Sequence, residues 1–435
     1  MPSSRPSDNR PLLATHLPIF YGWVIVPIAG LALFVSGPGQ TYTISIFVDP
    51  IIEDMGWSRT LVASIYTAGS LSAAAFMVAV GRLLDRYGAR VMLMAVGILF
   101  GFAVMGMSRV HHPAELYLGF AAVRTLGQGS LTLIPTTLVA LWFIRRRGKA
   151  TAIASLGGAA SQATFPPITH LLISQLGWRN AWVTLAFMIW GLLLLPVVTL
   201  VRRNPESVGL YPDGDPTPAQ ILERASVPSN QHEVDWTLGE AVHTPAFWLL
   251  LFAGSSLSLI STALVFHQVS LFASKGLDAS LAAVALTVMA VMAMAGTLLG
   301  GLLADRFPNR YVLASAQAIV IMAMLWTFVI SHPWEALVYG GMLGMGGGLF
   351  MTISTVIWPN YFGRKHLGAI RGVATTSMIG FAALGPMPFA FLFDLTGSYT
   401  TAIISFLALP AACAIAALLA RPPTKEVAGM ADVQS

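Results

Sequence analysis

The sequence predicts an all-α membrane protein with twelve transmembrane helices arranged in two pseudo-symmetric six-helix bundles. Three observations support this fold class: the composition, the number of membrane-length apolar stretches, and a repeat that relates the two halves of the chain. Of 435 residues, 56% are hydrophobic and only 10% are charged, whereas a soluble chain carries about 25% charged residues. We therefore expect the lipid bilayer as surroundings, and the small net charge of +5 gives no sign of a nucleic-acid partner.

A membrane span needs about 20 apolar residues, and the chain divides into twelve such stretches. The first six are residues 20–48, 59–83, 90–109, 114–143, 149–176 and 179–201, and the second six are 246–274, 279–303, 310–331, 334–361, 367–394 and 398–420. We expect an N-terminal bundle over 20–201, a polar central loop over 202–245 and a C-terminal bundle over 246–420. Residues 1–19 and 421–435 are the expected tails, so no segment is large enough to house a soluble enzyme domain.

The Lys and Arg residues between the spans predict the orientation in the membrane. With both termini inside, the outer loops keep only Arg59, Arg109, Arg179 and Lys275, and the other loop and tail cations lie inside. Cytoplasmic loops carry such an excess of positive charge. We therefore expect a multi-pass protein of the plasma or inner membrane, with both termini and the central loop in the cytoplasm.

A constant shift of 220 residues aligns the two halves. It places Gly81, Asp85 and Arg86 on Gly301, Asp305 and Arg306, and it also pairs Gly56 with Gly276, Gly148 with Gly368, Pro166 with Pro386, and Gly177 with Gly397. One offset that holds at separate places indicates a duplicated six-span unit. Such repeats are typical of secondary transporters, whose substrate site lies between the halves near the membrane midplane.

Short motifs carry a family resemblance. GRLLDRYGAR (81–90), between spans 2 and 3, resembles the loop motif of the major facilitator superfamily, and GLLADRFPNR (301–310) is a weaker second copy. RTLGQGS in span 4 resembles that superfamily's Arg-x-x-Gln/Gly-Gly motif. The strings FYGWVIV, GWSRT, WTLGEAVHTPAFWLL and GAIRGVATT are similar to the oxalate/formate antiporter and monocarboxylate transporter group. The resemblance implies transport by alternating access.

The loop motif and its copy provide the predicted gating residues. These are Gly81, Asp85, Arg86, Arg90, Gly301, Asp305 and Arg306. We expect Gly81 to allow close helix contact. Asp85 would either cap the start of span 3 or pair with a positive charge there. Arg86 and Arg90 would hold the loop at the inner leaflet. The resemblance implies that the motif gates the inward-facing transition, while a role in topology and packing alone is equally compatible.

Arg124 in span 4 is the main candidate for substrate binding, because an ionisable group inside a span is costly and marks function by default. Helical spacing places Gln128 and Thr132 on its stripe. The sequence offers no acidic residue in the mid-membrane to neutralise Arg124. An anionic substrate or a cage of carbonyl oxygens would then be its partner. The alternative is structural, with Arg124 holding neighbouring helix ends.

Four further polar residues complete the predicted substrate-binding set: Gln40, Tyr66, Gln162 and His267. Gly37-Pro38-Gly39 interrupts span 1 and would place Ser36, Gln40 and Thr43 on one face beside a cavity, with Gln40 at a depth similar to Arg124; a proline kink with packed hydroxyls is the alternative. The imidazole of His267 can bond a carboxylate or become cationic when protonated, or can simply be satisfied by a backbone carbonyl.

The absence of charged residues from two of the spans narrows the range of expected substrates. Span 8 has no charged residue, and the one cation of span 11, Arg371, lies near its inner end. Oxalate transporters of the resembled group use a cationic residue in each of these spans, so a monoanion or a neutral solute fits better than a dianion. With no membrane-buried Asp or Glu, a coupled proton would travel on histidine or on the substrate's own carboxyl group. No phosphate loop or metal-ligand spacing predicts a cofactor.

We therefore expect a monomeric secondary transporter of a small organic anion, most simply a monocarboxylate, with proton symport and anion exchange both open. The alternative is an exporter of apolar or drug-like compounds, which the Met-rich, uncharged span 8 and Gly385-Pro386 in span 11 would suit. A non-transporting nutrient sensor is a third reading, though it usually needs a longer tail or loop. An enzyme is not expected.

Overall fold

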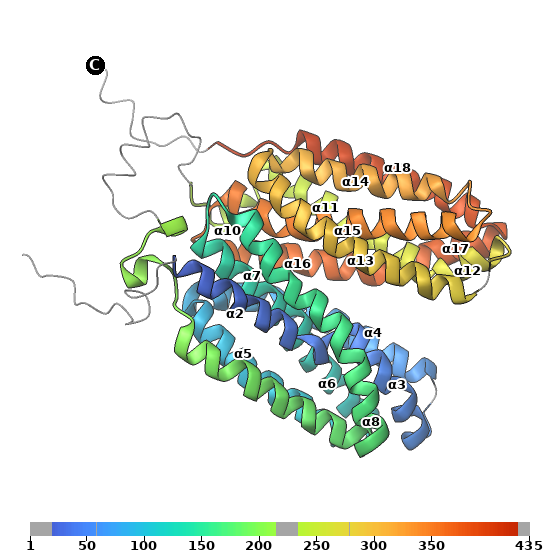
Figure 1. The fold of residues 1–435 in the computed structure, drawn as a ribbon, viewed down its shortest axis with the longest axis horizontal. Coiled ribbons are helices and arrows are strands. Elements are labelled where there is room, and N and C mark those ends of the chain that lie inside the picture. The colour runs from blue at the N-terminus through green and yellow to red at the C-terminus, as the bar shows by residue number, and fades with distance from the viewer. Residues whose placement is uncertain (1–19, 58, 215–233, 278, 425–435) are drawn as a thin grey trace, which may run out of the picture.

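Two helical bundles lie side by side in the computed structural model, which describes residues 20–57, 59–214, 234–277 and 279–424 (Figure 1). Every regular element in this part of the chain is a helix. The first bundle comprises α2 to α8 and the second α11 to α18, so the predicted all-α, two-bundle fold is confirmed. The cores of the two bundles form two separate clusters of buried apolar side chains.

Six spans build the N-terminal bundle, and two of them are broken into pieces. Span 1 consists of α2 (Gly22–Val35), the 3₁₀ turn η1 (Gly37–Gly39) and α3 (Thr41–Met55), and span 4 of α6 (Pro113–Val123), the π-helical η2 (Arg124–Ser130) and α7 (Leu131–Trp142). Spans 2 and 3 are α4 (Arg59–Tyr87) and α5 (Ala89–Met107). Spans 5 and 6 both lie in α8 (Arg147–Leu200), which turns at Gly177.

The C-terminal bundle repeats this plan. Its spans are α11 (Pro245–Phe266) with α12 (Gln268–Ser274), α13 (Ala279–Arg306), α14 (Asn309–Trp326), α15 (Pro333–Phe362), α16 (Leu367–Leu384) with α17 (Pro386–Thr396), and α18 (Tyr399–Leu419). The segment that connects the two bundles along the chain contains η3 (Glu206–Val208), η4 (Pro212–Gly214) and α10 (Leu238–Ala241). Within the described residues, eight helices are individually long and apolar enough to cross a membrane; the remaining spans are shorter, broken or less apolar.

Local backbone features obey the 220-residue shift found in the sequence. Gly56 and Gly276 have φ angles of 66° and 74°, and Gly177 and Gly397 have φ angles of 78° and 67°. All four φ angles are positive, which glycine tolerates at little cost. Glu115 accepts hydrogen bonds from the N–H groups of His111 and His112 at the start of α6, and Glu335, 220 residues later, does the same for Ser331 and His332 at the start of α15. The duplication therefore extends to the way helices begin.

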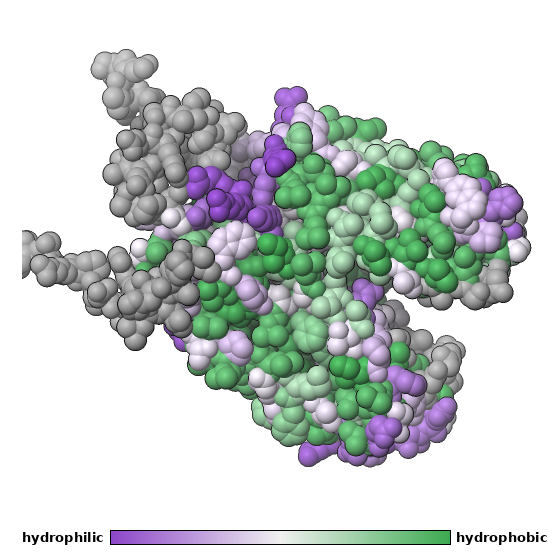
Figure 2. Space-filling model, viewed as in Figure 1, coloured by the Kyte–Doolittle hydropathy of each residue, from purple (hydrophilic) through white to green (hydrophobic). Residues whose placement is uncertain are grey.

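The bundles touch at one end and separate at the other. The start of α2, the end of α18 and helix α10 lie at the closed end (Figure 1), which we call the terminal end; the opposite end is the open end. There a notch separates the two lobes in the space-filling view (Figure 2). Helix α4 packs against α16, and α8 packs against α13, so each contact pairs one helix from either bundle. This shape exposes the space between the bundles at the open end.

Small residues let helices approach closely within the C-terminal bundle. Gly340, Gly344 and Gly348 on α15 face α13, where a Cβ atom on each would come within 2.6, 2.1 and 2.0 Å of a carbonyl oxygen. The oxygens belong to Ala285, Met289 and Ala293, which share the same spacing of four. The two helices therefore pack closely along this face, as in the small-residue interfaces of membrane helices.

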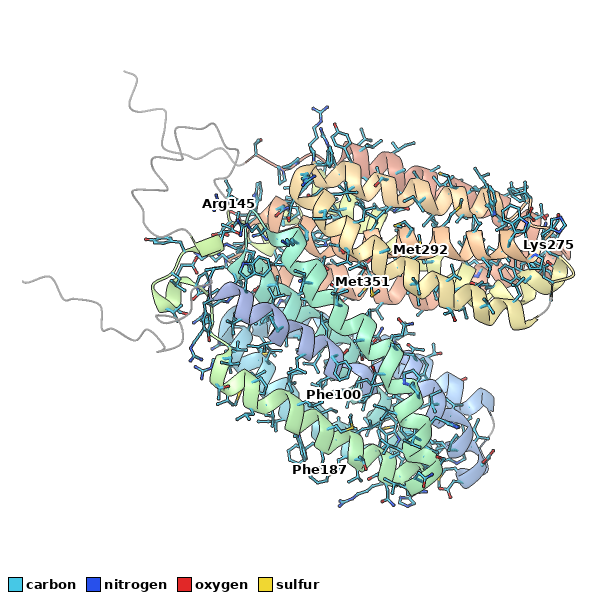
Figure 3. All side chains as sticks on the ribbon, viewed as in Figure 1. Phe100, Arg145, Phe187, Lys275, Met292 and Met351 are labelled. Carbon is cyan, nitrogen blue, oxygen red and sulfur yellow. The ribbon has the colours of Figure 1, made fainter. Side chains whose placement is uncertain are left out.

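On the face seen in Figure 2, an apolar surface covers the middle of the molecule, and polar residues gather toward its two ends. Large apolar side chains are exposed on it, among them Phe187 and Leu195, at 59% and 69%. Figure 3 shows Phe187 on the outside of the N-terminal bundle, with Arg145 at the terminal end and Lys275 at the open end. Exposed apolar area of this extent is unusual for a protein surrounded by water and suits a hydrocarbon environment.

Candidate functional site

Arg124 lies at the first residue of the π-helical segment of span 4, and its side chain is only 6% exposed. Its Nε donates to the hydroxyl of Ser70 on α4 over 3.1 Å, and its Nη1 donates to the hydroxyl of Thr41 on α3 over 3.0 Å. Within the described side chains, no carboxylate pairs with this guanidinium. Short π segments inside α-helices occur frequently at functional sites.

The ring of Tyr66 covers the guanidinium on one side. The Arg124 Cζ atom lies 5.0 Å from the ring centroid, within the range of a cation–π interaction. The Tyr66 hydroxyl is 2.8 Å from the Thr41 hydroxyl. Thr41, Tyr66 and Ser70 therefore form a cradle of hydroxyls and one aromatic face, which stabilises a cation without neutralising it.

The break in span 1 brings Thr41 to Arg124. Gln40 is extended, with φ −88° and ψ 153°, and α3 begins at the next residue. A Cβ atom at Gly39 would lie 2.6 Å from the Val123 carbonyl oxygen and 2.7 Å from the Gly127 Cα, so only glycine lets the two backbones meet here. The Gly-Pro-Gly sequence thus serves both to stop α2 and to seat the start of α3 against span 4.

The expectation that Ser36, Gln40 and Thr43 share one face of span 1 is wrong. Because Gln40 is extended, the helical register is lost between α2 and α3, and spacings of four and seven no longer align side chains. Gln40 instead donates to the Ser36 hydroxyl over 3.0 Å, and Ser36 donates to the Leu33 carbonyl over 2.7 Å, which is the local capping of a kink. Thr43 is fully buried.

The hydrogen bonds described for Arg124 do not include Gln128 or Gln162. Gln128 is half-buried four residues along span 4, where the wider turn of the π segment displaces it from the expected i, i+4 stripe. Gln162 is exposed on α8. Its neighbour Ser161 is the anchored residue, accepting from the Tyr42 hydroxyl over 2.7 Å and donating to the Phe34 carbonyl over 2.7 Å.

His267 lies in the C-terminal bundle, at the junction between α11 and α12. Its ring stacks on Phe389 of α17 at 5.2 Å and lies 5.9 Å from the ring of Tyr399 on α18. The described contacts do not join His267 to Arg124. A site that used both residues would therefore have to span the space between the bundles.

The two loop-motif aspartates close the terminal end. The carboxylate of Asp85 accepts hydrogen bonds of 2.7 Å from the N–H groups of Gly368 and Ala369, at the start of α16 in the other bundle. Asp305 accepts from Gly148 and Lys149, at the start of α8, over 2.7 and 3.0 Å. The expectation that Asp85 acts at the start of span 3 is wrong, because the free N–H groups at the start of α16 face it across the boundary and bind it as a helix N-terminus binds an anion.

Glycines allow this approach on both sides. A Cβ atom at Gly81 would lie 2.1 Å from the Gly368 carbonyl oxygen, and one at Gly148 would lie 2.3 Å from that of Gly301. The two contacts are related by the 220-residue shift. The expected close helix contact at Gly81 is present, and its partner is α16 of the opposite bundle.

The motif arginines lie outside this closure. Arg90 donates to the Val198 carbonyl over 2.8 Å and joins α5 to the end of α8. Arg86 is exposed and lies over the ring of Tyr87 at 5.4 Å, and Arg306 is exposed at the end of α13. These three side chains lie at the terminal end, where the sequence predicts an inner-leaflet position.

Two arginines that the sequence analysis counted only as loop charges tie the bundles together. Arg147 donates to the carbonyls of Phe143 and Ala140 over 2.9 and 3.2 Å, and it also bonds Asn360 of the other bundle. Arg364 donates to the Leu141 carbonyl of the N-terminal bundle over 2.7 Å. A run of basic residues after a span indicates orientation in a sequence, and it gives no sign of such cross-bundle partners.

The central segment binds the loop before each of these helix starts. Asp213 accepts from the N–H groups of Ile144 and Arg145 over 3.0 and 2.8 Å, and Asp235 accepts from those of Arg364 and Lys365 over 3.0 and 3.1 Å. The segment is thus fixed to both bundles at the terminal end. Nothing in the spacing of these aspartates predicts their partners, because both contacts depend on the fold.

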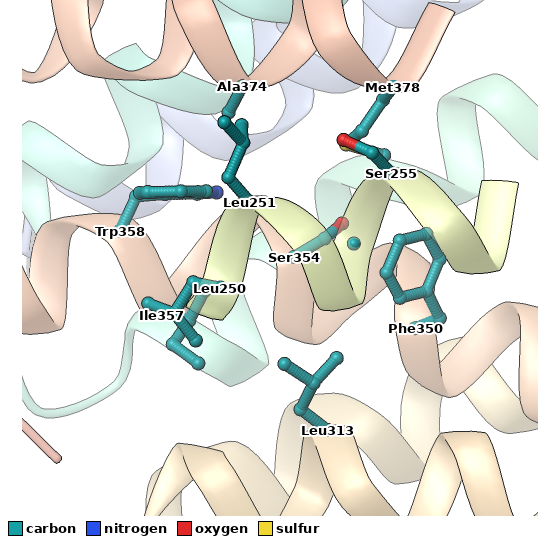
Figure 4. Close-up of a pocket in the computed structure, with 11 residues that line it drawn as sticks. Leu250, Leu251, Ser255, Leu313, Phe350, Ser354, Ile357, Trp358, Ala374 and Met378 are labelled. Atoms are coloured by element: carbon teal, nitrogen blue, oxygen red, sulfur yellow. The ribbon is translucent and has the colours of Figure 1, made fainter. Parts of the chain in front are cut away.

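Three cavities accompany this arrangement. One of about 330 Å³ and one of about 480 Å³ lie at the terminal end, beside Asp85 and Asp305 respectively. A third, of only about 10 Å³, lies inside the C-terminal bundle and is lined mainly by apolar side chains of α11, α14, α15 and α16 (Figure 4). Its Ser255 and Ser354 hydroxyls already donate to Ser377 and to the Met351 carbonyl. The described residues show no cluster of side chains that could hold a metal ion.

Comparisons with known proteins agree with this architecture. The sequence model of the Major Facilitator Superfamily matches residues 29–284 and 268–431. Monocarboxylate transporter 2 of Mesocricetus auratus is 24% identical over 87% of this chain and 79% of its own, and the oxalate:formate antiporter of Oxalobacter formigenes is 24% identical over 89% and 90%. The resemblance predicted from the short motifs is confirmed.

The structure is similar to that of a proton:xylose symporter, XylE, bound to 6-bromo-6-deoxy-D-glucose. The TM-score is 0.69 at 15% identity, covering 92% of this chain and 94% of the symporter. At this identity the likeness concerns the fold alone, which is two six-helix bundles. The chain therefore belongs to the Major Facilitator Superfamily and has the membrane-transporter fold of that family.

Proposed function

We propose that this protein is a secondary active transporter that moves a small organic anion, most simply a monocarboxylate, across the membrane by alternating access. The observation that carries the substrate class is the guanidinium of Arg124, which is 6% exposed and bonds two hydroxyls and one aromatic face. A buried charge without a carboxylate partner is costly. A substrate carboxylate, bound through charge-assisted hydrogen bonds, supplies the missing partner.

The geometry of the site favours a single carboxylate group. Nε and Nη1 of Arg124 are engaged by Ser70 and Thr41, and Nη2 makes no bond within the described part of the chain. Thr41 is exposed and Tyr66 half-buried, so solvent reaches the edge of the cradle. An anion that entered from the open end would bond Nη2 and displace Thr41, while the Tyr66 hydroxyl remained available to it as a donor.

The names of two relatives support this class at low identity. One is a monocarboxylate transporter and the other an oxalate:formate antiporter. Gln40, Gln128 and Gln162 would shape the N-terminal wall of the passage, and His267 would face it from the C-terminal bundle. The loop-motif aspartates would close the terminal end in this state and release it in the next. We place both termini in the cytoplasm, with the working unit a monomer.

Uptake into proteoliposomes tests the proposal. The purified chain is reconstituted and offered radiolabelled monocarboxylates, dicarboxylates and a neutral sugar, with and without an imposed pH gradient, and with empty or acid-loaded vesicles. We expect a monocarboxylate to be taken up, driven either by the pH gradient (symport) or by internal anion (exchange). No uptake of any carboxylate, in a preparation shown to be folded by its melting transition, contradicts the proposal.

The second candidate is an exporter of apolar or drug-like compounds, which the Met-rich span 8, without a charged residue over 279–303, would suit. Resistance profiling in a host that lacks its own drug pumps separates the two functions. Raised resistance to apolar compounds, together with no carboxylate uptake, would favour the exporter.

A further inference from the structure

A second buried guanidinium, that of Arg371, lies at the boundary between the bundles. Arg371 is the fifth residue of α16 and its side chain is 7% exposed. Its Nη1 donates to the hydroxyl of Thr137 on α7, in the opposite bundle, over 3.1 Å. In the part of the chain that the structure describes, this is its one hydrogen bond, and no carboxylate pairs with it. The sequence analysis treated Arg371 only as a charge near the inner end of span 11.

The surroundings of Arg371 differ from those of a structural arginine in the same region. Arg147, which is 1% exposed, has two backbone carbonyls and the Asn360 side chain as acceptors. Five N–H donors need such a cage when a guanidinium is buried. Arg371 has one neutral hydroxyl instead. It therefore keeps most of its positive charge uncompensated, as Arg124 does.

The guanidinium groups of Arg124 and Arg371 lie at different depths in the membrane, as their positions relative to span 4 show. Thr137, the partner of Arg371, follows Arg124 by thirteen residues in span 4, which corresponds to roughly 20 Å along the helix axis. Thr137 also lines the 330 Å³ cavity at the terminal end, together with Asp85 and Leu141. Arg124 is thus nearer the open end and Arg371 nearer the terminal end, beside that cavity.

The carboxylates that share this cavity wall are already bound. Asp85 accepts from Gly368 and Ala369, and Asp235 accepts from the N–H groups of Arg364 and Lys365. Glu206 pairs with the Arg364 side chain at 3.2 Å. None of these three is bonded to Arg371 in the described contacts, so the guanidinium is not their counter-ion.

We propose that Arg371 is a second anion-binding station, which holds a small carboxylate at the terminal end after the bundles have separated there. Thr137 and Arg371 belong to different bundles, so opening the terminal end breaks their hydrogen bond. The guanidinium then has no partner in its own bundle among the described residues. The carboxylate that leaves Arg124 takes the place of the Thr137 hydroxyl. This inference rests on the proposed function.

The first test uses charged thiol reagents and does not depend on transport. Cys413, the single cysteine, is replaced by alanine, and Leu141→Cys places a thiol on the cavity wall one turn from Thr137. Reaction rates with a sulfonate-bearing and an ammonium-bearing methanethiosulfonate are compared, with and without Arg371→Gln. We expect the preference for the anionic reagent to fall about tenfold when the arginine is removed, and Arg124→Gln to leave it unchanged. An equal preference with and without Arg371 overturns the proposal.

The second test measures the two faces of transport separately. In proteoliposomes of known orientation, Arg371→Gln should raise the half-saturating acid concentration on the terminal side by about tenfold and leave that on the open side within about twofold. Arg371→Lys should recover part of the terminal-side affinity. Equal effects on both sides would make Arg371 a structural residue and contradict the proposal.

The two tests distinguish failure of this inference from failure of the proposed function. A wild-type chain that carries no acid contradicts the proposed function, while the reagent preference still reports whether Arg371 attracts anions. A chain that carries the acid, with an Arg371→Gln variant that behaves as the wild type on both sides, contradicts only the inference. If Arg371→Gln does not fold, Arg371→Lys and Thr137→Val serve in its place, and Thr137→Val should preserve the anionic preference.

Discussion

The carboxylate of Asp85 accepts a 2.7 Å hydrogen bond from the backbone N–H of Gly368, across the boundary between the two bundles. The residues are 283 positions apart in the chain, and the 220-residue shift relates their contact to that of Asp305 with Gly148. Each bundle thus contributes one carboxylate and one helix N-terminus to the closure. Because neither group can bind when the bundles separate, the pair of contacts stabilises the state that is closed at the terminal end.

Asp85→Asn should weaken this closure. The amide keeps one acceptor oxygen but loses the charge that favours a helix N-terminus, and one of the two N–H groups loses its acceptor. Labelling of Leu141→Cys from the terminal side, in the Cys413→Ala background, should become about tenfold faster. Glu53→Gln, the same change at an exposed position near the open end, is the control. Equal labelling rates in Asp85→Asn and the parent would contradict the role of Asp85.

Gly81→Ala should prevent the terminal end from closing fully. Its Cβ atom would lie 2.1 Å from the Gly368 carbonyl oxygen, a backbone atom that cannot move without its helix. Exchange transport should be lost, and Leu141→Cys should stay accessible from the terminal side. Gly106→Ala on α5, where a Cβ atom meets nothing within 4 Å, is the matched control and should transport normally. Normal exchange by Gly81→Ala would mean that the bundles do not close as the structure shows.

Tyr66 should act on substrate affinity through both its ring and its hydroxyl. Tyr66→Phe keeps the ring face at 5.0 Å from the Arg124 guanidinium and removes the hydrogen bond with Thr41, so the half-saturating concentration should rise by less than about fivefold. Tyr66→Leu also removes the cation–π interaction and should raise it further. Initial uptake rates over a range of acid concentrations measure both effects. If Tyr66→Leu has no larger effect than Tyr66→Phe, the ring does not support the arginine.

The ion pair of Asp54 at the open end should make the stability of the fold depend on pH. It pairs with Arg179 and accepts from the Trp178 indole over 3.2 Å, and the hydrogen bond with Arg179 holds the pKa of the Asp54 carboxyl below its usual range. A lowered folded-state pKa stabilises the fold above the unfolded-state value, about 3.9, and this stabilisation is lost as the pH falls through the folded-state pKa.

The melting temperatures of the wild type and of Asp54→Asn should therefore differ by a constant amount between about pH 5 and 8 and converge below about pH 4. The measurement is a thermal melt in detergent at a series of pH values. Glu53→Gln, next in the sequence, should show no such convergence. A wild-type advantage that persists unchanged in acid would contradict the role assigned to this ion pair.

The spans and the repeat could be predicted because they depend on local composition and on a constant spacing. Apolar runs of membrane length give the helices, and the shift that aligns Gly56 with Gly276 also aligns their left-handed backbones. The polar, Gly-Pro-rich part of span 1 was correctly expected to interrupt a helix. These features need no knowledge of which helices are neighbours.

The details of the site could not be predicted, because they depend on tertiary contacts. Thr41 reaches Arg124 only because the extended Gln40 shifts the register of α3. The residue of span 1 that bonds Arg124 is therefore Thr41, and not the predicted Gln40. The sequence of span 2 does not distinguish Ser70 from the other hydroxyl residues of that helix, because its role depends on the packing of α4 against span 4. Asp85 finds its hydrogen-bond donors in the other bundle, and Arg371 finds Thr137 there, a partner that no spacing within span 11 indicates.

The proposed function depends above all on the pairing of Arg124 with the substrate carboxylate. The most direct measurement is the initial uptake of the best monocarboxylate by Arg124→Gln, Arg124→Lys and the control Arg109→Gln, together with the competition by the acid and by its neutral amide. We predict at least about a tenfold loss of uptake for Arg124→Gln, partial recovery for Arg124→Lys, wild-type uptake for Arg109→Gln, and competition by the acid but not by the amide. Wild-type uptake by a folded Arg124→Gln variant would contradict the claim.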